Sequence, residues 1–158
     1  MVYALLKIIH LMATIVWLGG MFFALFCLRH AVHPLLPEQR LAVMAQALGR
    51  FFKVVAVAAV LVLGSGGWMV AQTARATRRT GAPFNIPLEW LVMAGLGGLM
   101  VLIFLGVAAL PLRRLRRAAA ALDWRQGSAA LASIRRWVGI NLTIGAVIVV
   151  VVVAGTMS

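Results

Sequence analysis

The stretch VYALLKIIHLMATIVWLGGMFFALFCL, from Val2 to Leu28, decides the fold of this chain. It is longer than the roughly 20 apolar residues that a helix needs to cross a bilayer. Lys7 and His10 interrupt it three residues apart, so they share one helix face. An ionisable group inside an apolar span costs about 3 kcal/mol on insertion scales and marks a functional site by default. We therefore expect a membrane helix that also carries a site.

Three further segments are long and apolar enough to cross a membrane, at about residues 51–73, 88–112 and 137–157. Of the 158 residues, 64% are hydrophobic and only 11% are charged, whereas about a quarter of a soluble domain is charged. In hydrocarbon the backbone must pair its polar groups within each segment, which favours helices. The sequence predicts an all-α integral membrane four-helix bundle, with residues 1–158 forming a single transmembrane domain whose first span covers residues 2–28.

The basic residues are distributed unevenly between the connections. Of the 15 Lys and Arg residues, eleven follow the first or the third span, and three lie between the second and the third. The positive-inside rule then places the first and third connections in the cytoplasm. Both the N and the C terminus are therefore predicted on the periplasmic side. The net charge of +12 is explained by topology, and no array of stacking aromatic residues accompanies it, so we expect no nucleic-acid binding.

The third span is followed directly by the most basic run of the chain, RRLRR. Such a run anchors a helix end on the cytoplasmic side. It also attracts anionic membrane lipids, by about 1 kcal/mol per basic residue near the surface. Both roles are compatible, and the residues concerned are Arg113, Arg114, Arg116 and Arg117.

The two long connections also contain helical patterns. Apolar residues at helical spacing predict a short amphipathic helix over Glu38–Leu48, leading into the second span. The third helix is expected to continue beyond its span as far as Trp124 or Arg125, and residues 126–128 (Gln-Gly-Ser) to end it.

The polar side chains of the first span lie on a single stripe, with members alternately four and three residues apart. A polar stripe in a membrane helix faces the bundle interior or a water-filled cavity. We expect this face to contact the other three helices. The stripe consists of Tyr3, Lys7, His10, Thr14, Trp17 and Met21.

The depth of the two ionisable groups follows from helix geometry. His10 is eight residues from Val2, or about 12 Å along a helix, which places it in the outer half of the membrane. Lys7 lies nearer the outer surface and could extend its ammonium outward. Glu89, at the start of the third span, enters from the same side. We therefore expect an ion pair between Lys7 and Glu89.

His10 has three interpretations: a structural hydrogen bond within the bundle, a ligand to haem or copper, or a proton relay. Imidazole and thioether groups both suit Cu(I). Weaker metal candidates are the outer methionines and the pair of histidines at the inner edge, namely Met12, Met69, Met93, His30 and His33. No nucleophile–base set, phosphate loop or paired carboxylates are present, which argues against a hydrolytic enzyme.

The first span also contains the pattern K-x-x-H-x(6)-W-x-G-G-x-F-F, which resembles the small four-helix proteins of the copper-resistance D (CopD) family. Further resemblance lies in Phe26–Arg29, Leu48–Phe52 and Arg113–Arg117. The pattern is formed by Lys7, His10, Trp17, Gly19, Gly20, Phe22 and Phe23.

This resemblance implies copper homeostasis or import across the bacterial inner (plasma) membrane by a multi-pass protein, with a periplasmic copper donor as a possible partner. The family is distantly similar to HemJ-type protoporphyrinogen oxidases, which implies haem b as the alternative cofactor in a redox protein. Relatives often carry histidines where this chain has Leu88–Trp90 and Leu105–Gly106. Only His10 therefore transfers as a ligand. A structural subunit without a ligand is the third alternative, and the sequence leaves the oligomeric state open.

Overall fold

The computed structural model describes residues 1–79, 81 and 86–155, and every regular element within these ranges is a helix. Helices α1 (Val2–Phe22), η1 (Phe23–Leu28, a π-helix) and α2 (Arg29–Ala31) follow one another without a break. The remaining helices are α3 (Pro37–Arg79), α4 (Leu88–Ala109), α5 (Pro111–Ala120) and α6 (Trp124–Gly155).

Four helical stretches are long and apolar enough to span a membrane, namely Val2–Ala31, Pro37–Arg79, Leu88–Ala120 and Trp124–Gly155. Each contains one of the predicted spans, which confirms the all-α membrane bundle. The last two residues of the predicted fourth span, 156 and 157, lie outside the described residues.

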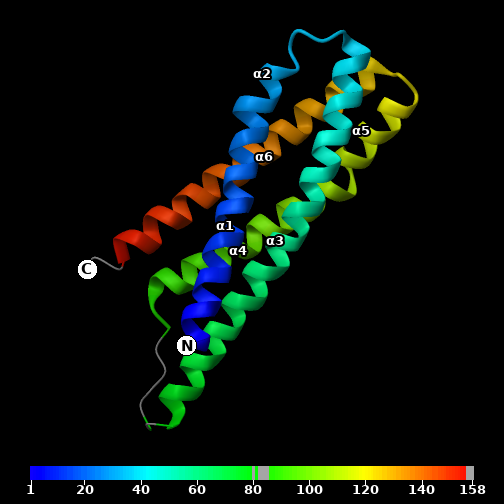
Figure 1. Ribbon diagram of the computed structural model, residues 1–158. Coiled ribbons are helices and arrows are strands. Elements are labelled where there is room, and N and C mark those ends of the chain that lie inside the picture. Colours follow the sequence, from blue (N-terminus) through cyan, green and yellow to red (C-terminus); the bar gives the residue numbers. More distant parts are fainter. Residues whose placement is uncertain (80, 82–85, 156–158) are drawn as a thin grey trace.

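The helices pack as two pairs (Figure 1). α1 lies along α3, and α4 lies along α6. α5 packs against α6 and α3, close to the connection between α2 and α3. We call this part of the bundle, formed by residues 29–50 and 111–136, the arginine-rich end. The opposite end, which holds the N-terminus and the last turns of α6, is called the terminal end.

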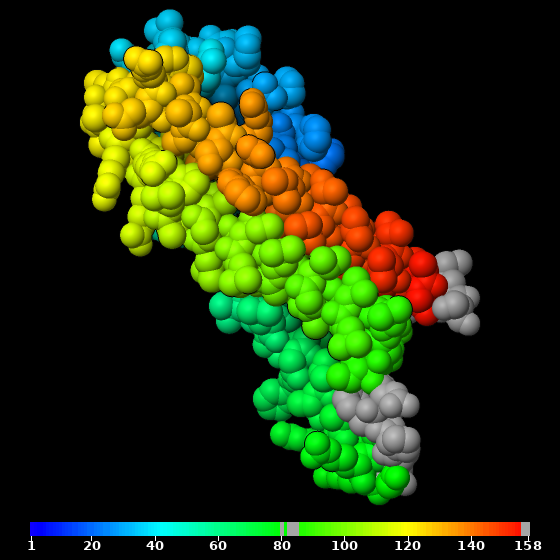
Figure 2. Space-filling view, turned by 180° about the vertical axis from the view of Figure 1, so that it is seen from behind, coloured from blue at the N-terminus to red at the C-terminus, as the bar shows by residue number. Residues whose placement is uncertain are grey.

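An aromatic cluster joins the two pairs near the middle of the bundle. The ring of Trp17 on α1 meets the ring of Phe104 on α4 edge to face, with centroids 6.2 Å apart, and Phe52 on α3 stacks on Phe104 at 5.3 Å. Gly145 on α6 packs against Leu18, and a methyl group at this glycine would overlap that leucine. Toward the terminal end the pairs separate, so that the last turns of α3 and α6 lie apart (Figures 1 and 2).

Three helix boundaries differ from the sequence prediction. The predicted short helix at Glu38–Leu48 is the first part of α3, because no residue between it and the second span breaks the backbone pattern. The third helix is interrupted at Leu110, just before Pro111, whose ring cannot continue an α-helix. The next helix starts earlier than expected, at Trp124 rather than after Ser128.

The early start of α6 has a local cause at Asp123. Its Oδ1 atom accepts a hydrogen bond of 2.9 Å from the backbone N–H of Gln126, as an N-cap residue does. Leu122, just before it, has a φ of 54°, in the left-handed region that makes the turn. Gly127 then lies inside the helix, where the side chain of Leu41 fills the space that a Cβ would need.

Helix α5 is amphipathic. Leu112, Leu115 and Ala118 are buried against the bundle, whereas the basic residues predicted as an anchor are all exposed, namely Arg113, Arg114, Arg116 and Arg117. These side chains are therefore available to solvent or to lipid headgroups, and lipid binding by them stays a prediction.

Candidate functional site around His10

The imidazole of His10 lies between α1 and α3, half-buried, and its hydrogen-bond partners come from α3. Its Nδ1 atom is 3.1 Å from the carbonyl oxygen of Val62 and 3.1 Å from Oγ of Ser65. Ser65 is a polar residue that is 5% exposed in an otherwise apolar part of α3, and its hydroxyl donates to the carbonyl oxygen of Leu61. The site therefore consists of one imidazole held by one turn of α3.

The partners decide which nitrogen of His10 carries the proton. A carbonyl oxygen only accepts hydrogen bonds, so Nδ1 must be the donor to Val62. The proton of Ser65 is directed to Leu61, so Ser65 also accepts from Nδ1. A neutral imidazole has one N–H, and Nε2 is therefore left with a free lone pair. This is the arrangement of most metal-binding histidines, which donate the other ring N–H to a carbonyl or carboxylate.

Gly66 allows the ring to lie this close to α3. A Cβ at this position would be 3.2 Å from Cε1 and 3.4 Å from Nδ1 of His10. One turn further along α1, Thr14 donates from Oγ1 to the backbone carbonyl of His10 at 2.8 Å. Gly66 therefore lets α1 and α3 approach closely at His10, whereas the hydrogen bond of Thr14 lies within α1.

The stripe of α1 does not face the other three helices along its whole length. Trp17 and Met21 are buried, and they contact α4 through Phe104 and α6 through Asn141. The polar contacts of His10 and Thr14 are with α3 and with α1 itself, as described above. At the terminal end, 43% of the surface of Tyr3 is exposed, and Lys7 is exposed as well. The cause is the separation of the two helix pairs toward the terminal end.

Lys7 and Glu89 lie on helices of different pairs, since α1 packs on α3 whereas α4 packs on α6. The side chain of Glu89 packs beside Gly155 at the end of α6. The ion pair expected between Lys7 and Glu89 stays a prediction.

A comparison with known families extends this description. A family model described as copper resistance protein D (CopD) matches residues 45–155, which is well over half of the chain. The chain belongs to the CopD family. No curated protein and no solved structure matches it. The matched region begins at residue 45, within α3, and includes Val62, Ser65 and Gly66, whereas His10 precedes it in the chain.

The CopD membership directs attention to copper ligands. Within the described residues, no group of three or more His, Cys, Asp or Glu side chains could hold a metal ion. Among the methionines, Met12 is 56% exposed on the outer face of α1. Met69 is half-buried on α3, one turn from Ser65, and Met93 is half-buried on α4. The donor types suit Cu(I), and His10 is the histidine whose Nδ1 is held by a carbonyl oxygen of a different helix.

The histidines at the arginine-rich end do not act together. His30 uses Nδ1 in a 2.7 Å contact with the carbonyl oxygen of Phe26 on its own helix. His33 lies beyond the end of α2 and lines a cavity at the arginine-rich end that His30 does not line. The helix ends at Ala31, so the spacing of three no longer places the two imidazoles on one face.

Sequence reasoning did not identify the α3 side of the site around His10. The signal was present in Gly64-Ser65-Gly66-Gly67, where a hydroxyl and three small residues interrupt an apolar span. Small residues permit close helix approach in membranes, and a serine can hydrogen-bond across the interface. It also did not identify Asn141, which is 97% buried (3% exposed) on α6 and donates weakly to Sδ of Met21 at 3.7 Å.

Proposed function

We propose that this CopD-family membrane protein passes copper across the inner membrane and that Nε2 of His10 binds the ion on its way. One observation supports this most strongly: Nδ1 is committed to the carbonyl oxygen of Val62, so the other nitrogen is free to act as a ligand. The orientation expected from the charge distribution puts His10 in the periplasmic half, where a periplasmic copper donor could deliver the ion.

Copper is the cargo in this proposal and not a resident cofactor. A single imidazole, with thioether groups such as that of Met69 as further soft donors, holds Cu(I) less firmly than a full set of ligands. Release is then easy, as passage through a membrane requires. The absence of a three-residue ligand group within the described residues fits a transient contact better than a storage site.

The test compares the three histidines of the chain. The purified protein is loaded with Cu(I) and its bound copper measured, and copper accumulation is measured in cells that produce it. His10→Ala should lower both, while His30→Ala and His33→Ala serve as matched controls and should leave both unchanged. Equal copper binding by the His10 variant and the unaltered protein would refute the proposal.

The visible spectrum of the same samples tests the other two alternatives. A Soret band that disappears in His10→Ala would mean that the free nitrogen binds haem iron, in a redox protein of the HemJ type. If the protein shows neither bound copper nor a Soret band, His10 has only a structural role, through its hydrogen bond to α3.

A further inference from the structure

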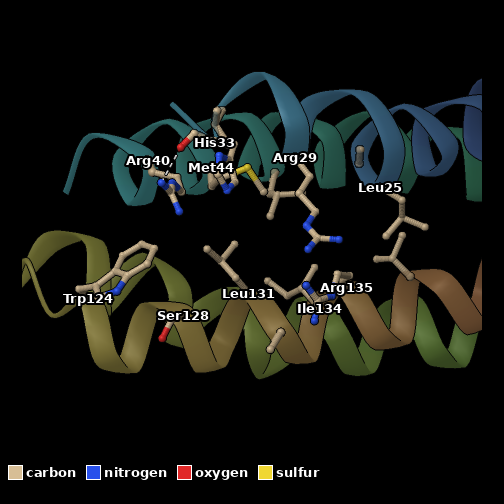
Figure 3. Close-up of a pocket in the computed structure, with 15 residues that line it drawn as sticks. Leu25, Arg29, His33, Arg40, Met44, Trp124, Ser128, Leu131, Ile134 and Arg135 are labelled. Atoms are coloured by element: carbon tan, nitrogen blue, oxygen red, sulfur yellow. Dashed lines mark hydrogen bonds between the residues drawn. The ribbon is translucent and has the colours of Figure 1, made fainter. Parts of the chain in front are cut away.

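A second site lies at the arginine-rich end, on the far side of the bundle from His10. A cavity of about 350 Å³, open on one side, lies between the segment η1–α2, the first turns of α3 and the first half of α6. Figure 3 shows side chains from both sides directed into the space between these helices, with Arg29 above and Arg135 below. The cavity has no part in the copper proposal.

Three guanidinium groups line this cavity and no carboxylate does. They belong to Arg29, Arg40 and Arg135, and the whole chain has only three acidic residues. Like charges that converge repel one another and favour a partner of opposite sign between them. The protein supplies none here, so the cavity is prepared for an anion from outside.

In Arg40, the shortage of hydrogen-bond acceptors can be assigned to a single atom. One of its terminal nitrogens donates to the carbonyl oxygens of His33 and Leu35, at 2.6 and 3.0 Å. Its guanidinium also lies over the ring of Trp124, 5.6 Å from the centroid. Its Nε–H, however, is buried without an acceptor among the described residues. The arginine is thus fixed in place and still has a donor to offer.

Apart from His33 and Ser128, the rest of the wall is mostly apolar. Leu25, Leu131, Ile134 and Val138 line the part of the cavity that runs toward the middle of the bundle. The π-helix η1 contributes to this arrangement. Each of its turns holds about one residue more than a turn of α-helix, so the positions that face inward shift by about one residue. Leu25 and Arg29 therefore both line the cavity. A suitable ligand is therefore anionic at one end and hydrocarbon at the other.

The position along the helices indicates the source of such a ligand. Arg29 directly follows the first apolar span, and Arg135 lies two residues before the fourth. These residues are therefore at the depth where the phosphates of a bilayer lie. Arginine binds phosphate oxygens through paired N–H donors, with stronger bonds than neutral groups make.

We propose that this cavity binds the phosphate of an anionic membrane lipid, with Arg29, Arg40 and Arg135 around the headgroup and an acyl chain along the apolar wall. Unlike the arginines of α5, which all lie on one helix, these three converge from different helices on one cavity. The bound lipid would connect the α1–α3 pair to α6 where their contacts are few.

The test is native mass spectrometry of the protein in detergent, titrated with phosphatidylglycerol or with phosphatidylcholine. One phosphatidylglycerol should bind preferentially. Arg29→Gln and Arg135→Gln should each weaken it roughly tenfold, the usual effect of losing a charge-assisted contact. Both side chains are exposed and make no hydrogen bond within the described residues, so the fold should persist.

Arg114→Gln and Arg117→Gln are matched controls, since they remove the same charge from the exposed face of α5 and should change nothing. Ala132→Phe provides a second variant that keeps every arginine and fills the cavity from α6, and it should also abolish binding. The proposal is overturned by equal affinity for the two lipids, by equal losses in the cavity and control variants, or by unaltered binding to Ala132→Phe. Inorganic phosphate that displaces the lipid at equal concentration would also overturn it, since the site would then be a simple anion site.

Discussion

The contact between His10 and Gly66 can be tested by replacing the glycine with alanine. A glycine in the middle of a helix is about 0.5–1 kcal/mol less stable than alanine, so an alanine with free space around it should stabilise α3. At Gly66 the added methyl group would lie 3.2 Å from Cε1 of His10, and the ring must move by a few tenths of an ångström. That movement stretches the two 3.1 Å hydrogen bonds of Nδ1.

Two costs oppose this gain in helix stability. An interhelical hydrogen bond in a membrane protein contributes about 0.6 kcal/mol, and crowding a packed ring costs about 1 kcal/mol or more. Gly66→Ala should therefore gain nothing, whereas Gly67→Ala, with no atom within 4 Å of its new methyl group, should gain the full helix term. We expect the two variants to differ by about 1–2 kcal/mol, and each kcal/mol corresponds to roughly 2–4 °C in Tm for a chain of this size.

Thermal unfolding in detergent, followed by tryptophan fluorescence, measures this difference. The same two substitutions are then made in a His10→Ala background, where the ring is absent. There Gly66→Ala should stabilise as much as Gly67→Ala does. If Gly66→Ala is already as stable as Gly67→Ala in the natural chain, or if the difference persists without the imidazole, the described contact between α1 and α3 is refuted.

Three further predictions concern the framework, each measured by the same unfolding assay. Asp123→Ala removes the cap of α6 and should cost about 1 kcal/mol; an unchanged Tm would show that the cap is dispensable. Gly145→Ala should destabilise by about 1–3 kcal/mol, because the methyl group overlaps Leu18, while Gly139→Ala on the same helix has free space and serves as the control; equal effects would contradict the close packing of α6. Asn141→Leu should stabilise by about 1 kcal/mol, since it removes a buried Oδ1 without a partner in the described chain; a lower Tm would mean that the amide has a partner in the membrane.

The membrane helices could be predicted because the signal for each span lies entirely within that span. A run of apolar residues long enough for the bilayer needs no information about its neighbours, and the structure confirms all four. The helix boundaries were predicted less well, although Pro111 and the Asp123–Gln126 cap are local signals that the sequence contains. The cap at Asp123 was missed because Gln-Gly-Ser, residues 126–128, was expected to end a helix.

Which helices pack against one another could not be predicted from the periodicity of the sequence. The stripe on the first span indicates which face is polar, but not which helix covers it or over what length. The pairs separate toward the terminal end, so Trp17 is buried while Lys7 is exposed on the same stripe. His10 could be singled out from its place in the apolar run, but its tautomer could not be predicted, since this depends on Val62 and Ser65, more than fifty positions away in the chain.

The unbroken length of α3 has a mechanical consequence. Its 43 residues form one rod that carries Arg40 at the lipid cavity and Val62 at the imidazole, about 33 Å apart along its axis. Without a proline or a break between them, a shift of this rod along its axis moves both groups together. A ligand that moves α3 at one end therefore changes the geometry at the other, and linkage makes the two effects on binding equal in free energy. The membrane's lipid composition and the reactivity of His10 would then be coupled through a single helix.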